Sequence, residues 1–297
     1  MRITDVLVTG GDGQLGRELR RCPLPAGWRL HMPDRSSLDL SDRGAIAKVM
    51  AARQWGAVIN AAAFTAVDMA ETDVAAAWEI NALAPAALAE ACARIDIPIL
   101  YVSTDYVFSG DRPGAWSEND PVRPIGVYGA SKLGGELAVR TSGARHAILR
   151  TSWVISAHRN NFLKTMLRLA TDRDTVRVVA DQHGRPTAAA DLARAVFAIA
   201  GTLVDHQTVI NGTFHFANDG VVNWADFARE IFRQSALRGG PSAQVESIGT
   251  ADYPTPARRP ANSVLDTSAI GTAFGIVPRP WTEAVADILD ELIGVVQ

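Results

Sequence analysis

Tyr128 and Lys132 are the residues of this 297-residue chain whose types and spacing most directly suggest chemistry. Four residues apart, they would lie on one face of a helix. A ketone that gains a hydride needs a proton at its oxygen, but an unperturbed tyrosine has a pKa of about 10. A neighbouring ammonium group favours the phenolate, lowers that pKa and can also bind ribose hydroxyl groups. We therefore take Tyr128 as the candidate proton donor and Lys132 as its partner.

Thr104 is the second candidate for chemistry, because it follows an apolar run that is typical of a strand. At the carboxyl edge of a sheet its hydroxyl would lie beside a cofactor. There it could hydrogen-bond the substrate oxygen and stabilise the negative charge that develops on it. The structural alternative is a hydroxyl that only forms a turn.

A glycine-rich loop follows the first predicted strand, with the sequence Gly10-Gly11-Asp12-Gly13-Gln14-Leu15-Gly16. Glycines at this spacing let the backbone turn sharply and approach a diphosphate, whose charge then faces the positive end of the next helix. The strand before the loop and the helix after it are the context that this pattern requires. We predict dinucleotide binding through Gly10, Gly13, Gln14, Leu15 and Gly16.

Further cofactor contacts are expected after the second and third strands. Asp34 could accept hydrogen bonds from ribose hydroxyl groups, which favours NADH, whereas neighbouring Arg35 could pair with the 2′-phosphate of NADPH. The sequence leaves NADPH or NADH open. Asp39 and Leu40 are expected along the adenine, and the remaining predicted contacts are Ala61, Ala62, Ala63, Phe64 and Thr65. For the alanines, tight packing between helix and sheet is an equal alternative.

The elements that must position these residues alternate between short β-rich runs and helical patterns. Strands separated by single helices require right-handed crossovers and predict a parallel sheet that is buried on both faces. We therefore expect an α/β fold with a Rossmann-type doubly wound core. The predicted strands are Val6–Thr9, Arg29–Pro33, Ala57–Asn60, Ile97–Ser103 and His146–Thr151, and the predicted helices begin near Gly13 or cover Asp42–Arg53 and Thr72–Ala93.

The second half of the chain alternates less regularly. Residues 1–151 are expected to form the dinucleotide-binding core, to which residues of about 175–215 return, and residues 152–297 a smaller, interleaved α/β lobe that binds the substrate. Residues 239–260 are rich in Gly, Pro and Ser, and no element is predicted there. The predicted elements are helices at Asn161–Ala170, Ala189–Ala200, Trp224–Gln234 and Glu283–Val295, and strands at Val176–Ala180 and Thr213–Ala217.

The composition is that of an ordinary globular enzyme, with 47% hydrophobic and 21% charged residues and a formal charge of −3. Scattered basic residues give no reason to expect a nucleic-acid or membrane partner. Cys22 and Cys92 lack disulfide or metal spacing, no apolar stretch reaches the roughly 18 residues of a membrane span, and no histidine has partners at ligand spacing. We expect a cytoplasmic protein without a catalytic metal.

These residues carry a resemblance to the extended short-chain dehydrogenase/reductases, and among them to the dTDP-4-dehydrorhamnose reductase family, over nearly the whole chain. The resemblance implies NAD(P)H-dependent reduction of the 4-keto group of dTDP-4-dehydro-L-rhamnose to dTDP-L-rhamnose, a precursor of cell-surface polysaccharide. The matching stretches are Gly13–Gly16, Asn60–Asp68 (NAAAFTAVD), Ser103–Phe108 (STDYVF), Val127–Glu136 (VYGASKLGGE), Arg150–Val154 (RTSWV), Asn160–Ala170 (NNFLKTMLRLA) and Asp181–Thr187 (DQHGRPT).

The same resemblance assigns roles to single residues. It implies that Thr104, Tyr128 and Lys132 carry catalysis. It also implies that Thr104, Asp105 and Trp153 contact the nucleotide sugar, together with Tyr128. Trp153 ends a predicted strand and its ring could stack on a sugar, with an ordinary core or rim position as the alternative. Related dehydratases follow the active-site threonine with Asp-Glu, whereas Tyr106 follows Asp105 here, which disfavours dehydration. Candidate cations for the diphosphate are Lys164, Arg168 and Arg185, with solvated surface charge as the alternative.

Some members of the family form homodimers bridged by Mg²⁺ through glutamates. Glu18 matches one such glutamate, but residues 188–190 are alanines where a second is expected, and only Asp191 is near. The resemblance thus leaves a homodimer open and puts the magnesium bridge in doubt.

Two other functions remain in competition with this reduction. The regulatory subunit of methionine adenosyltransferase resembles the same reductases but acts as a binding module. An epimerase or reductase of another nucleotide sugar is the enzymatic alternative, because selectivity for the sugar depends on the irregular lobe.

Overall fold

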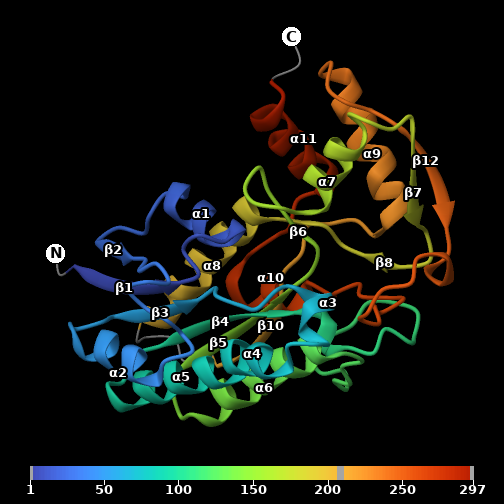
Figure 1. Cartoon of the computed structure of the whole chain (residues 1–297). Coiled ribbons are helices and arrows are strands. Elements are labelled where there is room, and N and C mark those ends of the chain that lie inside the picture. Colours follow the sequence, from blue (N-terminus) through green and yellow to red (C-terminus); the bar gives the residue numbers. More distant parts are fainter. Residues whose placement is uncertain (1–2, 206–210, 295–297) are drawn as a thin grey trace.

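The β-rich runs of the first half form one six-stranded sheet (Figure 1). The computed structural model describes residues 3–205 and 211–294, and within them the strand order is β10-β5-β4-β3-β1-β2 with every pair parallel. This sheet confirms the doubly wound α/β fold. Its strands are β1 (Thr4–Thr9), β2 (Trp28–His31), β3 (Ala57–Asn60), β4 (Ile99–Thr104), β5 (His146–Thr151) and β10 (Gly212–His215).

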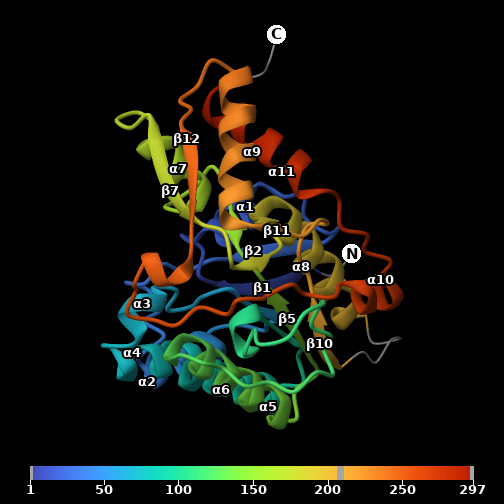
Figure 2. The same ribbon diagram turned by 90° about the vertical axis from the view of Figure 1, so that its right-hand side faces the viewer.

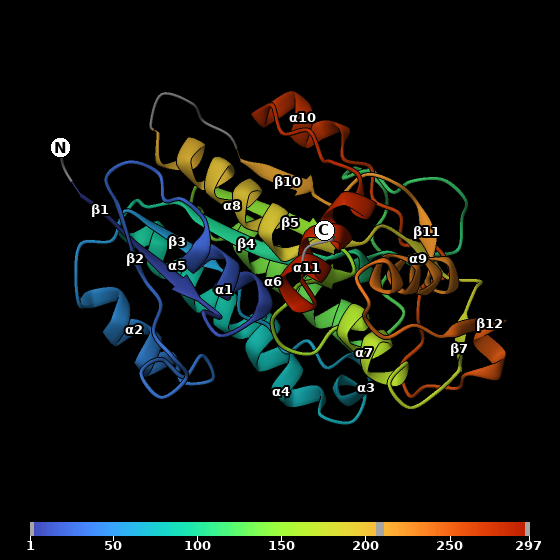
Figure 3. The same cartoon turned by 90° about the horizontal axis from the view of Figure 1, so that it is seen from above.

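Helices cover both faces of this sheet, because successive side chains of a strand point to opposite faces. Val6 and Val8 belong to the core cluster beneath α1 (Gln14–Arg21) and α8 (Ala189–Val204), whereas Leu7 belongs to the cluster on the other face. That second face is covered by α2 (Arg43–Ala51), α5 (Ala84–Arg94) and α6 (Val127–Thr141). Figure 1 shows α1 and α8 above the strands and α5 and α6 below them, and Figure 3 views the sheet from the side of α8.

The single helix predicted over Thr72–Ala93 is interrupted. After the short α3 (Val67–Ala70), the chain forms α4 (Val74–Trp78), a π-helical turn η1 (Glu79–Leu83) and α5. Pro85 lies in the first turn of α5 and has no backbone N–H to continue the α-helical ladder. The π turn directs Asn81 inward, where its side chain accepts a hydrogen bond from the Phe64 amide (2.8 Å) and donates one to Ser131 Oγ (3.0 Å).

The second lobe lies beside the carboxyl ends of the central strands (Figures 1 and 2). Its core cluster is formed by three helices and flanked by short strand pairs. The helices are α7 (Phe162–Leu169), α9 (Trp224–Leu237) and α11 (Trp281–Leu292). The strand pairs are β7 (Thr175–Val179) with β12 (Gln244–Ile248), β6 (Val154–Ile155) with β9 (Thr187–Ala188), and β8 (His183–Gly184) with β11 (Val222–Asn223).

Three features of the second half differ from the sequence-based expectations. The strand near Val176 pairs with β12 and not with the central sheet, so the return to the core begins only at α8. β12 forms inside the segment where no element was expected, because its partner lies far away in the sequence. The helix α10 (Ser268–Phe274), which packs near α8 and β10, was also not expected.

The remaining elements are the short 3₁₀ turns η2 (Asp105–Val107) and η3 (Thr250–Asp252). α11 ends at Leu292, and Val295, where the last helix was expected to end, lies outside the described residues. Among the residues that the structure describes, no helix combines the length and apolar character needed to cross a bilayer.

Candidate active site

A cavity of about 690 Å³ lies at the carboxyl ends of β1, β3, β4 and β5, where the second lobe meets the core. Tyr128 and Lys132 of α6 line it together with the glycine-rich loop. The predicted cofactor residues on its wall are Gly10, Gly13, Gln14, Leu15, Ala61, Ala62, Ala63 and Thr65. The fold therefore brings the candidate proton donor and the candidate cofactor loop into one space.

An adjoining cavity of about 270 Å³ gathers the other predicted cofactor residues: Asp34, Arg35, Asp39, Leu40 and Phe64. Asp34 Oδ1 accepts hydrogen bonds from Ser36 Oγ (2.7 Å) and the Ser37 amide (2.9 Å). The bond from the Ser36 side chain is the main cause that lowers the pKa of Asp34. An ionised carboxylate beside the exposed Arg35 guanidinium is thus available to a ribose hydroxyl.

The glycine loop fits a dinucleotide diphosphate. Gly10 has a φ of 77°, and a Cβ on it would lie 2.7 Å from the backbone of Ala61 and Ala62. Gly13 is the N-cap of α1 and supplies no side chain to the first amides, which remain free for an anion. Gly16 lines neither cavity. A Cβ on Gly16 would lie 2.3 Å from Gly10 O, so only glycine fits at this contact between helix and loop. Its position serves the close packing of helix and loop.

Thr104 ends β4 and is buried directly beside Tyr128. Its Oγ1 donates to Asp105 Oδ1 (3.0 Å) and accepts from the Tyr106 amide (3.2 Å). Burial raises the pKa of Tyr128 to about 12, and the interaction with the Thr104 hydroxyl opposes this rise. The phenol therefore keeps its proton at neutral pH, as a donor to a ketone oxygen must.

The expectation that Lys132 lowers the pKa of Tyr128 is wrong in this structure. The Lys132 ammonium donates to Val102 O (2.7 Å) and lies 4.1 Å from the centre of the Tyr101 ring. The side chain is only 1% exposed, and burial lowers the pKa of Lys132 to about 7. The ammonium is directed at Val102, and the group that lowers the pKa of Tyr128 is the Thr104 hydroxyl.

A buried ion pair supports this part of α6. Glu136, one turn beyond Lys132, accepts hydrogen bonds from Arg150 Nε (2.8 Å), Arg150 Nη2 (2.7 Å) and Ser103 Oγ (2.6 Å). The negative charge of Glu136 raises the pKa of Lys132, against the larger effect of burial. The bidentate pair ties α6 to β5, and through Ser103 to β4, so it holds the helix against the strand ends.

Asp105 is a buried carboxyl group next to Thr104. Burial raises the pKa of Asp105 to about 7, although the nearby hydroxyl groups of Ser263 and Thr104 lower it. Its Oδ2 is buried and has no hydrogen-bond partner within residues 3–205 and 211–294. A carboxyl group held in this way can donate or accept a hydrogen bond near neutral pH. The predicted sugar contact of Asp105 remains a prediction.

Trp153 does not offer the open ring face that was expected to stack on a sugar. Its ring lies on Trp224 with the centroids 3.5 Å apart and an interplanar angle of 10°. Gly184 lies close to the Trp153 ring, since a Cβ on Gly184 would lie 2.5 Å from Trp153 Cε2. The backbone of Trp153 is left-handed, with a φ of 46°, and the side chain does not line the main cavity. Contact with a sugar through the ring edge stays a prediction.

None of the three cations predicted for the diphosphate lines either cavity. Lys164 Nζ donates to Ala157 O (2.8 Å), and Arg185 Nη1 lies 3.8 Å from Asp219. The main cavity is lined instead by Arg159 and Asn160, which sequence reasoning did not single out. The stretch that begins at Asn160 matched the family, which was the one signal that pointed to this part of the chain.

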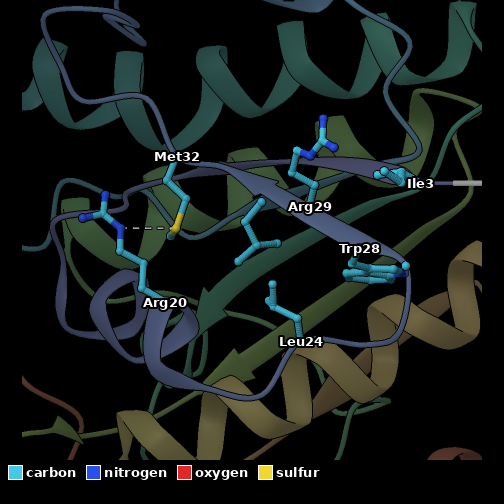
Figure 4. A pocket seen from close by; sticks show the side chains of 8 residues that line it. Ile3, Arg20, Leu24, Trp28, Arg29 and Met32 are labelled. Atoms are coloured by element: carbon cyan, nitrogen blue, oxygen red, sulfur yellow. Dashed lines mark hydrogen bonds between the residues drawn. The ribbon is translucent and has the colours of Figure 1, made fainter.

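A second cavity of about 690 Å³ lies at the edge strand β2 (Figure 4). Trp28, Leu24 and Ile3 give it an apolar lining, and Arg20 lies at its rim with Nε 3.4 Å from Met32 Sδ. No carboxyl, hydroxyl or thiol side chain is among its lining residues. The groups that could perform acid–base chemistry therefore lie in the main cavity.

The two carboxylates considered for a magnesium bridge are engaged with the protein. Glu18 lies 3.2 Å from His158 Nε2, and Asp191 pairs with Arg279 (2.9 Å) and accepts from Asn218 (2.7 Å). Within the described part of the chain, no group of three or more His, Cys, Asp or Glu residues is arranged to hold a metal ion. Independence from magnesium remains a prediction.

Comparison with known proteins agrees with this geometry. The family model described as the RmlD substrate binding domain matches residues 4–293. A dTDP-4-dehydrorhamnose reductase from Aggregatibacter actinomycetemcomitans is 43% identical over 288 residues, which cover 95% of this chain and 97% of that protein.

Two solved structures are similar along the whole chain. A dTDP-4-dehydrorhamnose reductase from Clostridium acetobutylicum has a TM-score of 0.91 and 36% identity, with 97% of this chain and 99% of that chain covered. The Bacillus anthracis dTDP-4-dehydrorhamnose reductase in complex with NADP has a TM-score of 0.90 and 33% identity, with 98% and 100% covered.

The parallel sheet, the glycine loop and the Thr104, Tyr128 and Lys132 set define an extended short-chain dehydrogenase/reductase. Within this class, the chain belongs to the family of the RmlD substrate binding domain, whose members include dTDP-4-dehydrorhamnose reductases.

Proposed function

We propose that this chain reduces the 4-keto group of dTDP-4-dehydro-L-rhamnose to dTDP-L-rhamnose with NADPH or NADH. The observation that carries the proposal is that Tyr128 and Lys132 line one cavity together with the glycine loop, with buried Thr104 beside Tyr128. The names of the relatives, which cover nearly the whole chain, supply the substrate. A nicotinamide dinucleotide would supply a hydride to the carbonyl carbon.

The residues of the chain provide the rest of the reaction. Tyr128 holds a proton at Oη and transfers it to the carbonyl oxygen as negative charge develops there, which completes the alcohol. The Thr104 hydroxyl orients that oxygen. Lys132 would bind the nicotinamide ribose, and the loop from Gly10 to Leu15 would hold the diphosphate at the start of α1.

For the choice between the two cofactors, we propose that Asp34 favours NADH. Its ionised carboxylate would accept the ribose hydroxyls and repel a 2′-phosphate. Asp34→Ala should then raise the dissociation constant of NADH about tenfold and that of NADPH less, as measured by cofactor fluorescence. Equal losses for both cofactors would remove this role from Asp34.

The function is tested by a panel of nucleotide-linked 4-keto sugars in which the oxidation of NADPH and NADH is followed by absorbance. We expect turnover with dTDP-4-dehydro-L-rhamnose and formation of dTDP-L-rhamnose. Turnover on a different nucleotide sugar would assign the chain to the second enzymatic possibility. Tight dinucleotide binding without turnover on any of these sugars would favour the regulatory binding module.

A further inference from the structure

Arg159 is a cation on the wall of the main cavity that no step of the reaction yet uses. The lining of that cavity includes two charged residues, Lys132 and Arg159. The Lys132 ammonium is buried and donates to Val102 O (2.7 Å). Arg159 is exposed, and no ion pair or hydrogen bond engages its guanidinium within the residues that the structure describes. It is therefore the cavity cation that is free to meet an anion.

The backbone of Arg159 is held in an unfavourable conformation. Its φ of 56° lies in the left-handed region, which non-glycine residues rarely occupy. Such a conformation persists only where the surroundings impose it, and it occurs preferentially at ligand-binding positions. A segment with no binding task could relieve it with glycine at this position.

Contacts with the start of α1 hold the segment on both sides of this residue. Gln14 Oε1 accepts hydrogen bonds from Ser156 Oγ (2.8 Å) and Asn161 Nδ2 (2.9 Å), on either side of Arg159. On the next turn of α1, Glu18 lies 3.2 Å from His158 Nε2. The segment that carries Arg159 is thus fastened to the first two turns of α1, directly at the predicted diphosphate site.

The negative charge of a bound diphosphate would need a cationic side chain nearby. The loop from Gly10 to Gly16 offers backbone amides and the helix dipole but includes no Lys or Arg, and its one charged side chain is Asp12. A dinucleotide diphosphate carries two negative charges. Arg17 and Arg20 of α1 lie beside the loop, but Arg17 Nε donates to Asp12 O (3.3 Å) and neither side chain lines the main cavity. Arg35 lines the adjoining cavity, so at the wall of the main cavity the free cationic side chain comes from the second lobe.

We propose that Arg159 binds the diphosphate of the dinucleotide from the second lobe, opposite the glycine loop. The inference rests on the proposed function, because it takes a dinucleotide as the ligand. Arg159 follows the segment that joins the core to the lobe. Its contact with the diphosphate would therefore hold the lobe against the cavity when the cofactor binds. Arg159 is a binding residue and takes no part in the transfer of hydride or proton.

The test compares two variants that both remove the charge but differ in the backbone. Arg159→Gln keeps a side chain in the left-handed conformation, and Arg159→Gly relieves it. We expect both variants to raise the dissociation constant of NADH about tenfold, as measured by fluorescence titration, because a charge-assisted hydrogen bond is lost. The difference from the unaltered protein should shrink as salt is added.

The control variant is Arg173→Gln, which removes an exposed arginine that lines neither cavity and should leave the NADH affinity unchanged. Thermal unfolding without ligand should show Arg159→Gly at or above the midpoint of the unaltered protein, which excludes misfolding as the cause. A titration with dTDP, whose diphosphate belongs to the substrate, distinguishes the two sources of this anion. We expect it to change by less than twofold in both Arg159 variants.

Unchanged NADH affinity in both variants would overturn the inference, and so would a loss confined to dTDP. A loss in Arg159→Gly with full affinity in Arg159→Gln would also overturn it, since backbone conformation and not charge would then matter. If the unaltered protein bound neither NADH nor NADPH, the proposed function itself would fail. That result is distinct from cofactor binding that does not depend on Arg159.

Discussion

The central sheet and the second lobe differ in how they hold their functional residues. In the sheet, Thr104 and Lys132 are buried, hydrogen-bonded and placed by the end of β4 and by the spacing of α6. In the lobe, strands of two to five residues flank an aromatic cluster, and the charged residue that reaches the cavity, Arg159, is exposed. The reacting groups are thus buried and hydrogen-bonded in the core, and we expect recognition of the ligand to depend more on the lobe.

The largest effect is expected from Tyr128→Phe, which tests whether the chemistry belongs to the core alone. The variant keeps the ring and its edge-on contact with Tyr106, so fold and cofactor binding should persist. Loss of the general acid should lower kcat by about 10²–10⁴-fold. The measurement is kcat with saturating dTDP-4-dehydro-L-rhamnose, together with the dissociation constant of NADH.

Thr104→Val serves as the matched comparison, because it removes only a hydrogen bond near the reacting oxygen. Its loss in kcat should be smaller than that of Tyr128→Phe. Near-full kcat in Tyr128→Phe, under conditions where hydride transfer limits the rate, would show that Tyr128 is not the proton donor.

The next prediction concerns the free energy of unfolding and its dependence on the buried carboxyl group of Asp105. Burial raises the pKa of Asp105 to about 7 in the folded state, so the folded protein favours the neutral carboxyl group. The stability that this group contributes is therefore fully present below about pH 4 and is lost as the pH rises through 7. Asp105→Asn replaces the carboxyl group with an amide that cannot ionise, so the variant does not lose this stability at high pH. At pH 8 the variant should exceed the unaltered protein in free energy of unfolding by a few kcal/mol, at about 1.4 kcal/mol for each pKa unit.

Denaturant unfolding at pH 5 and pH 8 measures this change. The advantage of the variant should be smaller at pH 5, since the unaltered carboxyl group is then mostly neutral in the folded state. An advantage that is the same at both pH values would show that Asp105 does not titrate in this range.

A smaller effect is expected in the lobe, from Trp224→Leu. The change removes the stack on Trp153 and the ring contact with Phe162, at a centroid distance of 4.5 Å. Because these rings pack the lobe and not the reacting groups, KM for the nucleotide sugar should rise about tenfold, while kcat changes much less. A fall in kcat as large as the rise in KM would break the separation between core and lobe.

The smallest effect is expected from removal of divalent cations. Asp191 is occupied by Arg279 and Asn218, and Glu18 lies beside His158, so neither is free to complete a magnesium site. EDTA should change turnover by less than about twofold and should leave the sedimentation of any oligomer unaltered. Activity that is lost with EDTA and restored by Mg²⁺ would contradict this expectation.

The sequence by itself determined the core and most of the cofactor site. The strands Ala57–Asn60 and His146–Thr151 were predicted with the boundaries that the structure has, since burial on both faces makes such strands short and mostly apolar. The glycine loop and the four-residue spacing of Tyr128 and Lys132 each lie within one short segment. Their local geometry can therefore be predicted from neighbouring residues alone. The carboxyl ends of parallel strands then bring them together.

Only the tertiary structure decided the lobe and the electrostatics. The pairing of β12 with β7, the stacking of Trp153 on Trp224 and the position of Arg159 at the cavity wall join residues that are distant in sequence. The direction of the Lys132 ammonium toward Val102, and the pKa values of Tyr128 and Asp105, depend on burial. Burial is a property of the packed chain as a whole, so no spacing of residue types could have shown it.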